Sequence, residues 1–145
     1  MDRQAGGGEA DRNSWHVRSP FGDFLGITIS ERGRGFCRLT CLVEAHHLNR
    51  GGALHGGVLL ALMDHAGGFA GSWVGEDAPE RLSVTVDLNG RFTRPVRSGV
   101  VSVEARIVGE GRSIYFVSTE IRDEAGLLVA FGSSTHKRLR ENNEK

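Results

Sequence analysis

The residues with the clearest chemical potential fall in one stretch of this 145-residue sequence, NRGGALHGGVLLALMDHAGG, residues 49–68. Asp64 lies in this stretch among apolar residues that recur at steps of three and four, the spacing of a helix. A carboxylate held on a helix can take a proton from water or attack a carbonyl carbon itself. Asp64 is therefore the first candidate for a catalytic base or nucleophile.

The start of this predicted helix is a second candidate. Leu54 and His55 stand where Ser, Thr, Asp or Asn would normally cap the free amides. We therefore expect the amides of Gly56 and Gly57 to lack an intramolecular partner. A helix N-terminus with free amides carries partial positive charge and attracts carbonyl oxygens, so this position predicts an oxyanion hole.

Helix geometry separates these two candidates. Asp64 follows Gly56 by eight residues, which corresponds to about 12 Å along a helix that rises 1.5 Å per residue. The two groups cannot flank one reacting carbon from within a single helix. If both act on one substrate, they come from two copies of the chain whose helices run antiparallel across a twofold axis, so we expect a dimer.

Glycines are unusually frequent around Asp64 on the predicted helix. Positions three, four and seven residues from it are Gly57, Leu60, Ala61, Gly67, Gly68 and Gly71. Each glycine costs roughly 1 kcal/mol relative to alanine inside a helix. We therefore expect another backbone or a ligand to pass close to this face; the alternative is a weak, exposed helix.

The remaining elements predict an α+β fold. The apolar stripe expected to face a sheet comprises Leu59, Leu62, Met63, Ala66, Ala70 and Trp73. Residues 26–43 read as two strands around the turn ERGRG, with Cys37, Leu39, Cys41 and Val43 alternating onto one face. Residues 81–92 alternate apolar and polar residues, and three more strand-like runs follow, separated by GEGR and RDEAG. Two strands, one long helix and four strands predict a helix packed against an antiparallel sheet.

Composition excludes several classes of partner. The 18 basic and 18 acidic residues cancel, and aromatic residues are few, so we expect no nucleic-acid partner. No apolar run is long enough to cross a membrane, and no signal peptide is visible. Cys37 and Cys41 would lie about 13 Å apart along a strand, too far for a disulfide, which favours a cytoplasmic setting.

The termini and the neighbouring histidines predict little chemistry. Residues 1–15 and 140–145 read as polar tails, which leaves one domain at residues 16–139. His46 and His47 would point to opposite faces of a strand, and no HExxH motif or cysteine cluster supports them. We therefore predict no metal site.

The helix motif also resembles a known family. The pattern Asn49, Gly52, His55, Gly56, Gly57 and Asp64 is similar to that of the hotdog-fold thioesterases of the phenylacetyl-CoA thioesterase (PaaI) type. Two later segments resemble the later strands of that family: residues 85–99, TVDLNGRFTRPVRSG, and residues 111–136, GRSIYFVSTEIRDEAGLLVAFGSSTH. The resemblance spans residues 21–138 and implies a hotdog fold, with an antiparallel sheet wrapped around one long central helix. It also implies an acyl-CoA substrate, no cofactor, and a homodimer that assembles into a homotetramer.

The resemblance assigns roles to individual residues. Asp64 would activate water or attack the thioester, and the Gly56 amide of the partner chain would polarise the carbonyl. Asn49 would orient the water or the carboxylate, His55 would hold the turn and line the site, and Thr85 would lie near the nucleophilic water. The residues expected to contact the CoA moiety are Gly57, Arg91, Arg94, Arg97 and Arg112, although solvated surface arginines are an equal interpretation of the last four.

Two other functions stay open at this point. One is a hydratase or dehydratase of the same fold, which would place an aspartate about five residues before a catalytic histidine; position 50 here is Arg50. The other is a non-catalytic acyl-CoA binding module. Turnover of acyl-CoA substrates separates these possibilities.

Overall fold

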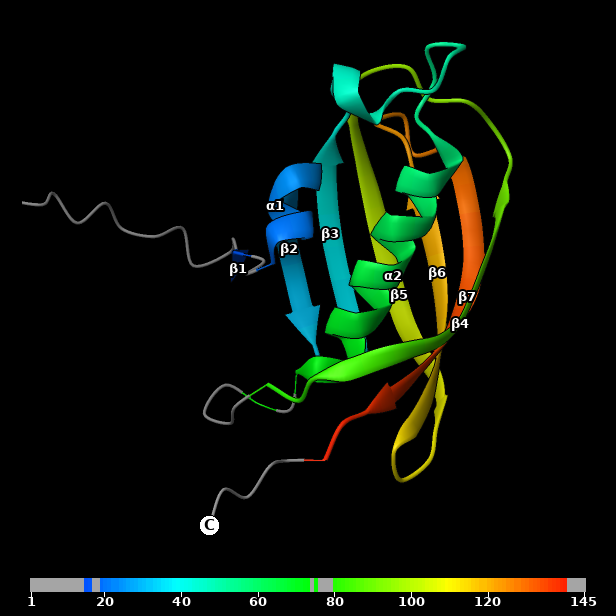
Figure 1. The fold of residues 1–145 in the computed structure, drawn as a ribbon. Coiled ribbons are helices and arrows are strands. Elements are labelled where there is room, and N and C mark those ends of the chain that lie inside the picture. Colours follow the sequence, from blue (N-terminus) through cyan, green and yellow to red (C-terminus); the bar gives the residue numbers. More distant parts are fainter. Residues whose placement is uncertain (1–14, 17–18, 74, 76–79, 141–145) are drawn as a thin grey trace, which may run out of the picture.

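A computed structural model describes residues 15–16, 19–73, 75 and 80–140. Its strands are β1 (Trp15–His16), β2 (Ile27–Gly33), β3 (Phe36–Leu42), β4 (Ser83–Phe92), β5 (Val100–Glu110), β6 (Ile114–Arg122) and β7 (Leu128–Arg138). They form one antiparallel sheet in the order β1-β2-β3-β5-β6-β7-β4, and helix α2 (Gly56–Ser72) lies across one face of it (Figure 1). The predicted α+β arrangement is confirmed.

The first hairpin follows the predicted alternation. Cys37, Leu39 and Cys41 on β3 are fully buried, and Val43 packs against the core just beyond the strand. Burial raises the pKa of Cys37 to about 12 and that of Cys41 to about 11, so both thiols stay protonated at neutral pH. Both cysteines are core residues, as small apolar side chains would be.

The stripe predicted for α2 is also confirmed. Leu59, Leu62, Met63, Ala66 and Ala70 are all buried against the sheet. Trp73 is the exception, because the helix ends at Ser72 and Trp73 is its partly buried C-cap residue.

Two short helices were not predicted. The helix α1 (Pro20–Leu25) begins at Ser19, whose hydroxyl accepts a hydrogen bond from the Gly22 amide at 2.8 Å, and ends at Gly26. A 3-10 helix, η1 (Ala45–His47), precedes the loop that leads into α2. Both are shorter than the periodic patterns that reveal a helix in a sequence.

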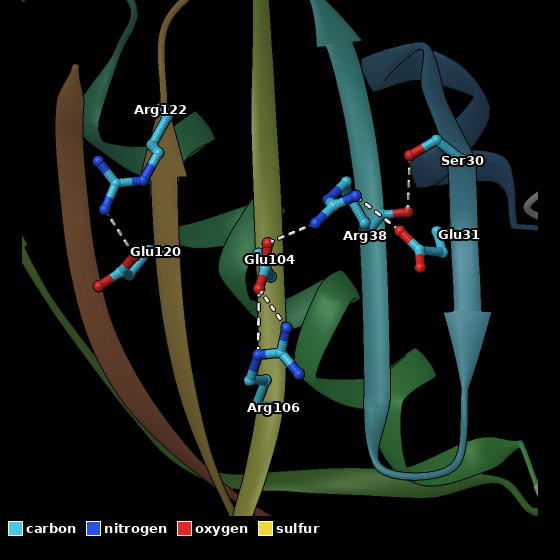
Figure 2. A network of polar contacts seen from close by, with 7 residues as sticks. All are labelled: Ser30, Glu31, Arg38, Glu104, Arg106, Glu120 and Arg122. Atoms are coloured by element: carbon cyan, nitrogen blue, oxygen red, sulfur yellow. Dashed lines mark hydrogen bonds and ion pairs between the residues drawn. The ribbon is translucent and has the colours of Figure 1, made fainter. Parts of the chain in front are cut away.

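The face of the sheet opposite α2 carries charged side chains beside exposed apolar ones such as Val108 and Phe116. Arg38 donates hydrogen bonds to Glu104 at 2.8 Å and to Glu31 at 2.6 Å, and Arg106 donates to Glu104 at 2.7 Å (Figure 2). The hydrogen bond from Arg38 lowers the pKa of Glu104 below its usual value. The buried apolar residues of the strands pack against those of α2, so the apolar core lies between the sheet and α2.

Strand β4 lies at one edge of the sheet and pairs only with β7. Its apolar residues Val84, Val86 and Phe92 are exposed, as is Leu82 just before the strand, and Leu88 is partly buried. An unpaired strand edge with exposed apolar side chains favours pairing with another chain. Among the described residues, the outer edge of β4 is left without a neighbouring strand.

The predicted tails lie almost entirely outside the described residues. Trp15 pairs with β2, one residue before the expected start of the domain, and Arg140 is the last described residue. Within the described segments, no helix has both the length and the apolar character needed to span a membrane.

Candidate active site

Asp64 and Thr85 meet between α2 and β4. The Thr85 hydroxyl donates to Asp64 Oδ1 at 2.5 Å, although 21 residues separate the two in sequence. Antiparallel pairing of Thr85 with His136 sets the register that brings Thr85 to the helix. The sequence predicts Thr85 near the nucleophilic water; in the structure its hydroxyl contacts the carboxylate of Asp64. Oδ1 is thus held, whereas Oδ2 has no hydrogen-bond donor in the part of the chain that the structure describes.

The start of α2 differs from the prediction. His55 is the N-cap residue, and its Nδ1 accepts a hydrogen bond from the Gly57 amide at 2.8 Å. The prediction of a free Gly57 amide is therefore wrong, because an imidazole nitrogen can replace the oxygen of a conventional cap. The Gly56 amide has no hydrogen-bond acceptor among the described residues.

Asn49 organises the loop that leads into α2. Its Oδ1 accepts hydrogen bonds from the amides of Gly51 at 2.9 Å and Ala53 at 3.1 Å. Gly52 has a φ of 78°, in the left-handed region that favours glycine, which accounts for its place in the motif. Arg97 donates to the carbonyl of Gly51 at 2.7 Å and fixes the same loop from outside.

A pocket of about 330 Å³ opens beside this loop. Its lining residues are Asn49, Ala53, Leu54, Gly56, Leu59, Phe92, Thr93, Arg94 and Pro95. Three of the predicted site residues, Asn49, Gly56 and Arg94, therefore share one pocket. Asp64 and Thr85 do not line it, so the candidate site is divided between two places on one chain.

The remaining predicted arginines lie apart from one another. Arg91 is exposed on β4, and Arg97 lies between β4 and β5, where it contacts the loop that contains Asn49. Arg112 lies in the β5–β6 turn, and Figure 1 shows this turn at the end of the sheet opposite the start of α2. Arg94 and Arg112 therefore cannot contact the same phosphate within one chain.

The glycines of α2 make room for the chain's own sheet. A Cβ at Gly67 would lie 2.6 Å from His136 Nε2, and a Cβ at Gly71 would lie 2.0 Å from Cζ of Tyr115. At these two positions the prediction of a passing backbone or ligand is wrong, because side chains of β6 and β7 occupy the space. Gly68 differs, since nothing lies within 4 Å of its Cβ position.

The buried His136 was missed by the sequence analysis. Its side chain is 1% exposed, and its Nδ1 lies 3.5 Å from Thr85 Oγ1, directly behind the contact with Asp64. Its only sequence signal is its place at the end of the run LLVAFGSSTH. Nothing in the sequence pairs that position with Thr85.

Glu44, His46 and His47 are the one group in the described ranges whose potential ligand atoms cluster, all within 4.8 Å. The premise that His46 and His47 face opposite ways is wrong, because both lie in η1 with ring centroids 4.1 Å apart. His47 Nδ1 accepts the Glu44 amide at 3.0 Å and so closes a capping box. Burial lowers the pKa of His47, in keeping with this neutral, structural role.

Comparisons with known proteins agree with this architecture. A family model described as thioesterase superfamily matches residues 51–130, which include Gly56, Asp64 and Thr85. Human acyl-coenzyme A thioesterase 13 is 30% identical over 105 residues, 71% of this chain and 71% of that one.

Solved structures give the same result. A thioesterase from Haemophilus influenzae superposes with a TM-score of 0.76 at 32% identity, covering 86% of this chain and 87% of that one. A mutant of the phenylacetic acid degradation protein PaaI from Thermus thermophilus superposes with a TM-score of 0.73 at 30% identity, covering 83% and 100% of the two chains.

Proposed function

Because this chain belongs to the thioesterase superfamily, a family of hydrolases, we propose that it hydrolyses small, medium-chain or aromatic acyl-CoA thioesters to a free acid and CoA. Two observations on one chain carry the proposal together. Asp64 is paired with Thr85, and the Gly56 amide lines a separate pocket and has no acceptor among the described residues. Both halves are needed for thioester hydrolysis, which requires a base or nucleophile and a stabiliser for the oxyanion.

The two halves come together in a dimer. The exposed edge of β4 supports antiparallel pairing with β4 of a second copy. Such pairing lays the two α2 helices side by side in opposite directions, so that Asp64 of one chain faces the start of α2 of the other. Each dimer then has two equivalent sites. A dimer of dimers is the expected complete assembly.

The reaction follows from the groups at each site. Asp64 Oδ2 either removes a proton from a water whose oxygen attacks the thioester carbon, or attacks that carbon itself and forms an anhydride that water then opens. The negative charge on the carbonyl oxygen is stabilised by the Gly56 amide of the partner chain, and Asn49 orients the water or the carboxylate. The C–S bond breaks, and CoA leaves as a thiolate that needs no strong acid.

The outer parts of the substrate have separate binding surfaces. The pocket beside Asn49 holds part of the CoA arm, with Arg94 at its rim and His55 holding the loop. Gly57, Arg91, Arg97 and Arg112 are the other proposed contacts of the CoA moiety. Because Arg112 is remote from Arg94 on one chain, the two would serve different phosphates or different chains of the assembly.

Turnover of an acyl-CoA panel tests the proposal. We expect release of free CoA thiol from short, medium or aromatic acyl-CoA, measured with a thiol reagent. Addition of water to enoyl-CoA without thiol release would instead identify a hydratase. Binding of acyl-CoA with no turnover of any member would identify a binding module.

A further inference from the structure

His136 is built into the structure directly beneath the helix that carries Asp64. Its imidazole lies parallel to the Tyr115 ring, with centroids 5.1 Å apart and an interplanar angle of 11°. Gly67 leaves room for it, because any side chain there would collide with His136 Nε2. Glycine at position 67 weakens the helix, but its lack of a side chain leaves the space that the His136 imidazole occupies.

The hydrogen bonds around His136 have a single consistent direction. An ionised carboxylate only accepts, so the Thr85 hydroxyl gives its one proton to Asp64 Oδ1 at 2.5 Å. Thr85 Oγ1 can then only accept from His136 Nδ1, 3.5 Å away. His136 therefore carries its proton on Nδ1, and its bare Nε2 accepts from the Ser134 hydroxyl at 2.8 Å.

The surroundings keep this imidazole neutral. Burial lowers the pKa of His136, and the charge of Asp64 opposes the change only partly. Two more titratable groups lie near this imidazole in the described part of the chain. Burial raises the pKa of Tyr115, and the guanidinium of Arg138 lies 4.5 Å from the Tyr115 ring centroid. A neutral imidazole has one donor and one acceptor nitrogen, as the hydrogen bonds to Thr85 and from Ser134 require.

We propose that His136 is a positioning residue for the reaction: its Nδ1–H holds the Thr85 hydroxyl in the orientation that donates to Asp64 Oδ1, which leaves Oδ2 directed at the substrate. This inference rests on the proposed role of Asp64. The distance of 3.5 Å is long for a hydrogen bond, and such links in substrate-free sites tighten when the substrate binds. His136 itself does not touch the substrate.

Two variants separate positioning from packing. His136→Gln keeps a polar group toward Ser134 but has no donor at the Nδ1 position, whereas His136→Asn places an amide nitrogen near that position. We expect His136→Gln to lower kcat about tenfold, the scale of one lost hydrogen bond, with KM unchanged. His136→Asn should restore most of the lost kcat.

The Thr85→Val background provides a readout that mere structural damage would not alter. Without the Thr85 hydroxyl, His136→Gln should have little further effect on kcat. The inference would be overturned if His136→Gln and His136→Asn lowered kcat equally. It would also be overturned if the effects of His136→Gln and Thr85→Val on kcat multiplied in the double variant. A wild-type rate in Asp64→Asn, measured alongside, would overturn the proposed role of the carboxylate and this inference with it. An inactive Asp64→Asn with an unaffected His136→Gln would overturn the inference alone.

The wild-type protein offers a test that does not depend on the folding of any variant. Nitrogen-15 NMR of the His136 ring should show a protonated Nδ1 and a bare Nε2 at neutral pH. The opposite tautomer, or a charged imidazolium, would contradict the proposed direction of donation.

Discussion

Asp64 has one oxygen held by Thr85, and the proposed mechanism uses the other. Asp64→Asn keeps an oxygen for the Thr85 hydroxyl but removes the negative charge, so we expect kcat to fall at least about a hundredfold without loss of folding. Asp87→Asn is the matched control, because Asp87 is an exposed carboxylate on the same strand as Thr85. If steady-state kinetics gave equal rates for both variants, Asp64 would have no catalytic role.

Gly56 is proposed to act through its backbone amide, which Gly56→Pro removes. Proline is well accepted at the first position of a helix, and the preceding His55 already has a compatible backbone, with φ −62° and ψ 136°. We expect kcat to fall roughly 10²–10³-fold, the usual cost of losing one oxyanion donor. Gly56→Ala keeps the amide and is the control; a similar loss in both variants would point to crowding against Phe92.

The element that determines the site most directly is α2, and its glycines fit the sheet. Gly71→Ala would force a methyl group into the Tyr115 ring, so we expect a loss of stability of about 1–3 kcal/mol. Gly68→Ala, with open space at its Cβ position, should be neutral or stabilising, since alanine favours a helix by roughly 1 kcal/mol. Thermal unfolding measures both. An unchanged melting temperature for Gly71→Ala would show that the helix can move away from Tyr115.

Elements could be predicted from the sequence where local periodicity specifies them. The β2–β3 hairpin, the buried stripe of α2 and the three later strands each carry such a pattern. The cap at His55 escaped prediction because imidazole is a rare cap, and α1 is too short to show a period. The contact of Thr85 with His136 spans 51 residues and depends on the register of β4 with β7, which no local pattern specifies.

At the scale of the whole molecule, the proposed pairing of two chains along the exposed edge of β4 connects assembly with activity. Val86→Lys places a charge on that edge, and charged residues oppose edge-to-edge pairing. We expect this variant to be a folded monomer by analytical ultracentrifugation and to lose hydrolysis. Val108→Lys is the matched control, since Val108 on β5 is 69% exposed and Val86 is 61% exposed. A monomeric but fully active Val86→Lys protein would separate assembly from chemistry.

The division of the candidate site between two regions of one chain is the reason that the proposed mechanism requires a dimer. The pocket at the start of α2 contains Asn49 and Gly56 but not Asp64, which lies about two turns further along the helix. The sequence predicted this division from helix rise alone. It could not predict that the edge of β4 is exposed, because Val84 and Val86 alternate with polar residues as buried residues would and yet are exposed.

Complementation between two inactive chains tests the shared site most directly. Asp64→Asn and Gly56→Pro chains are refolded together at equal concentrations, and hydrolysis is compared with each variant alone. Half of the dimers then contain one chain of each kind, and one of their two sites holds an intact Asp64 and an intact Gly56 amide. The account predicts recovery of about a quarter of the wild-type activity, as random pairing in a twofold dimer requires. Absence of recovery in mixtures shown to contain the mixed dimer would contradict it.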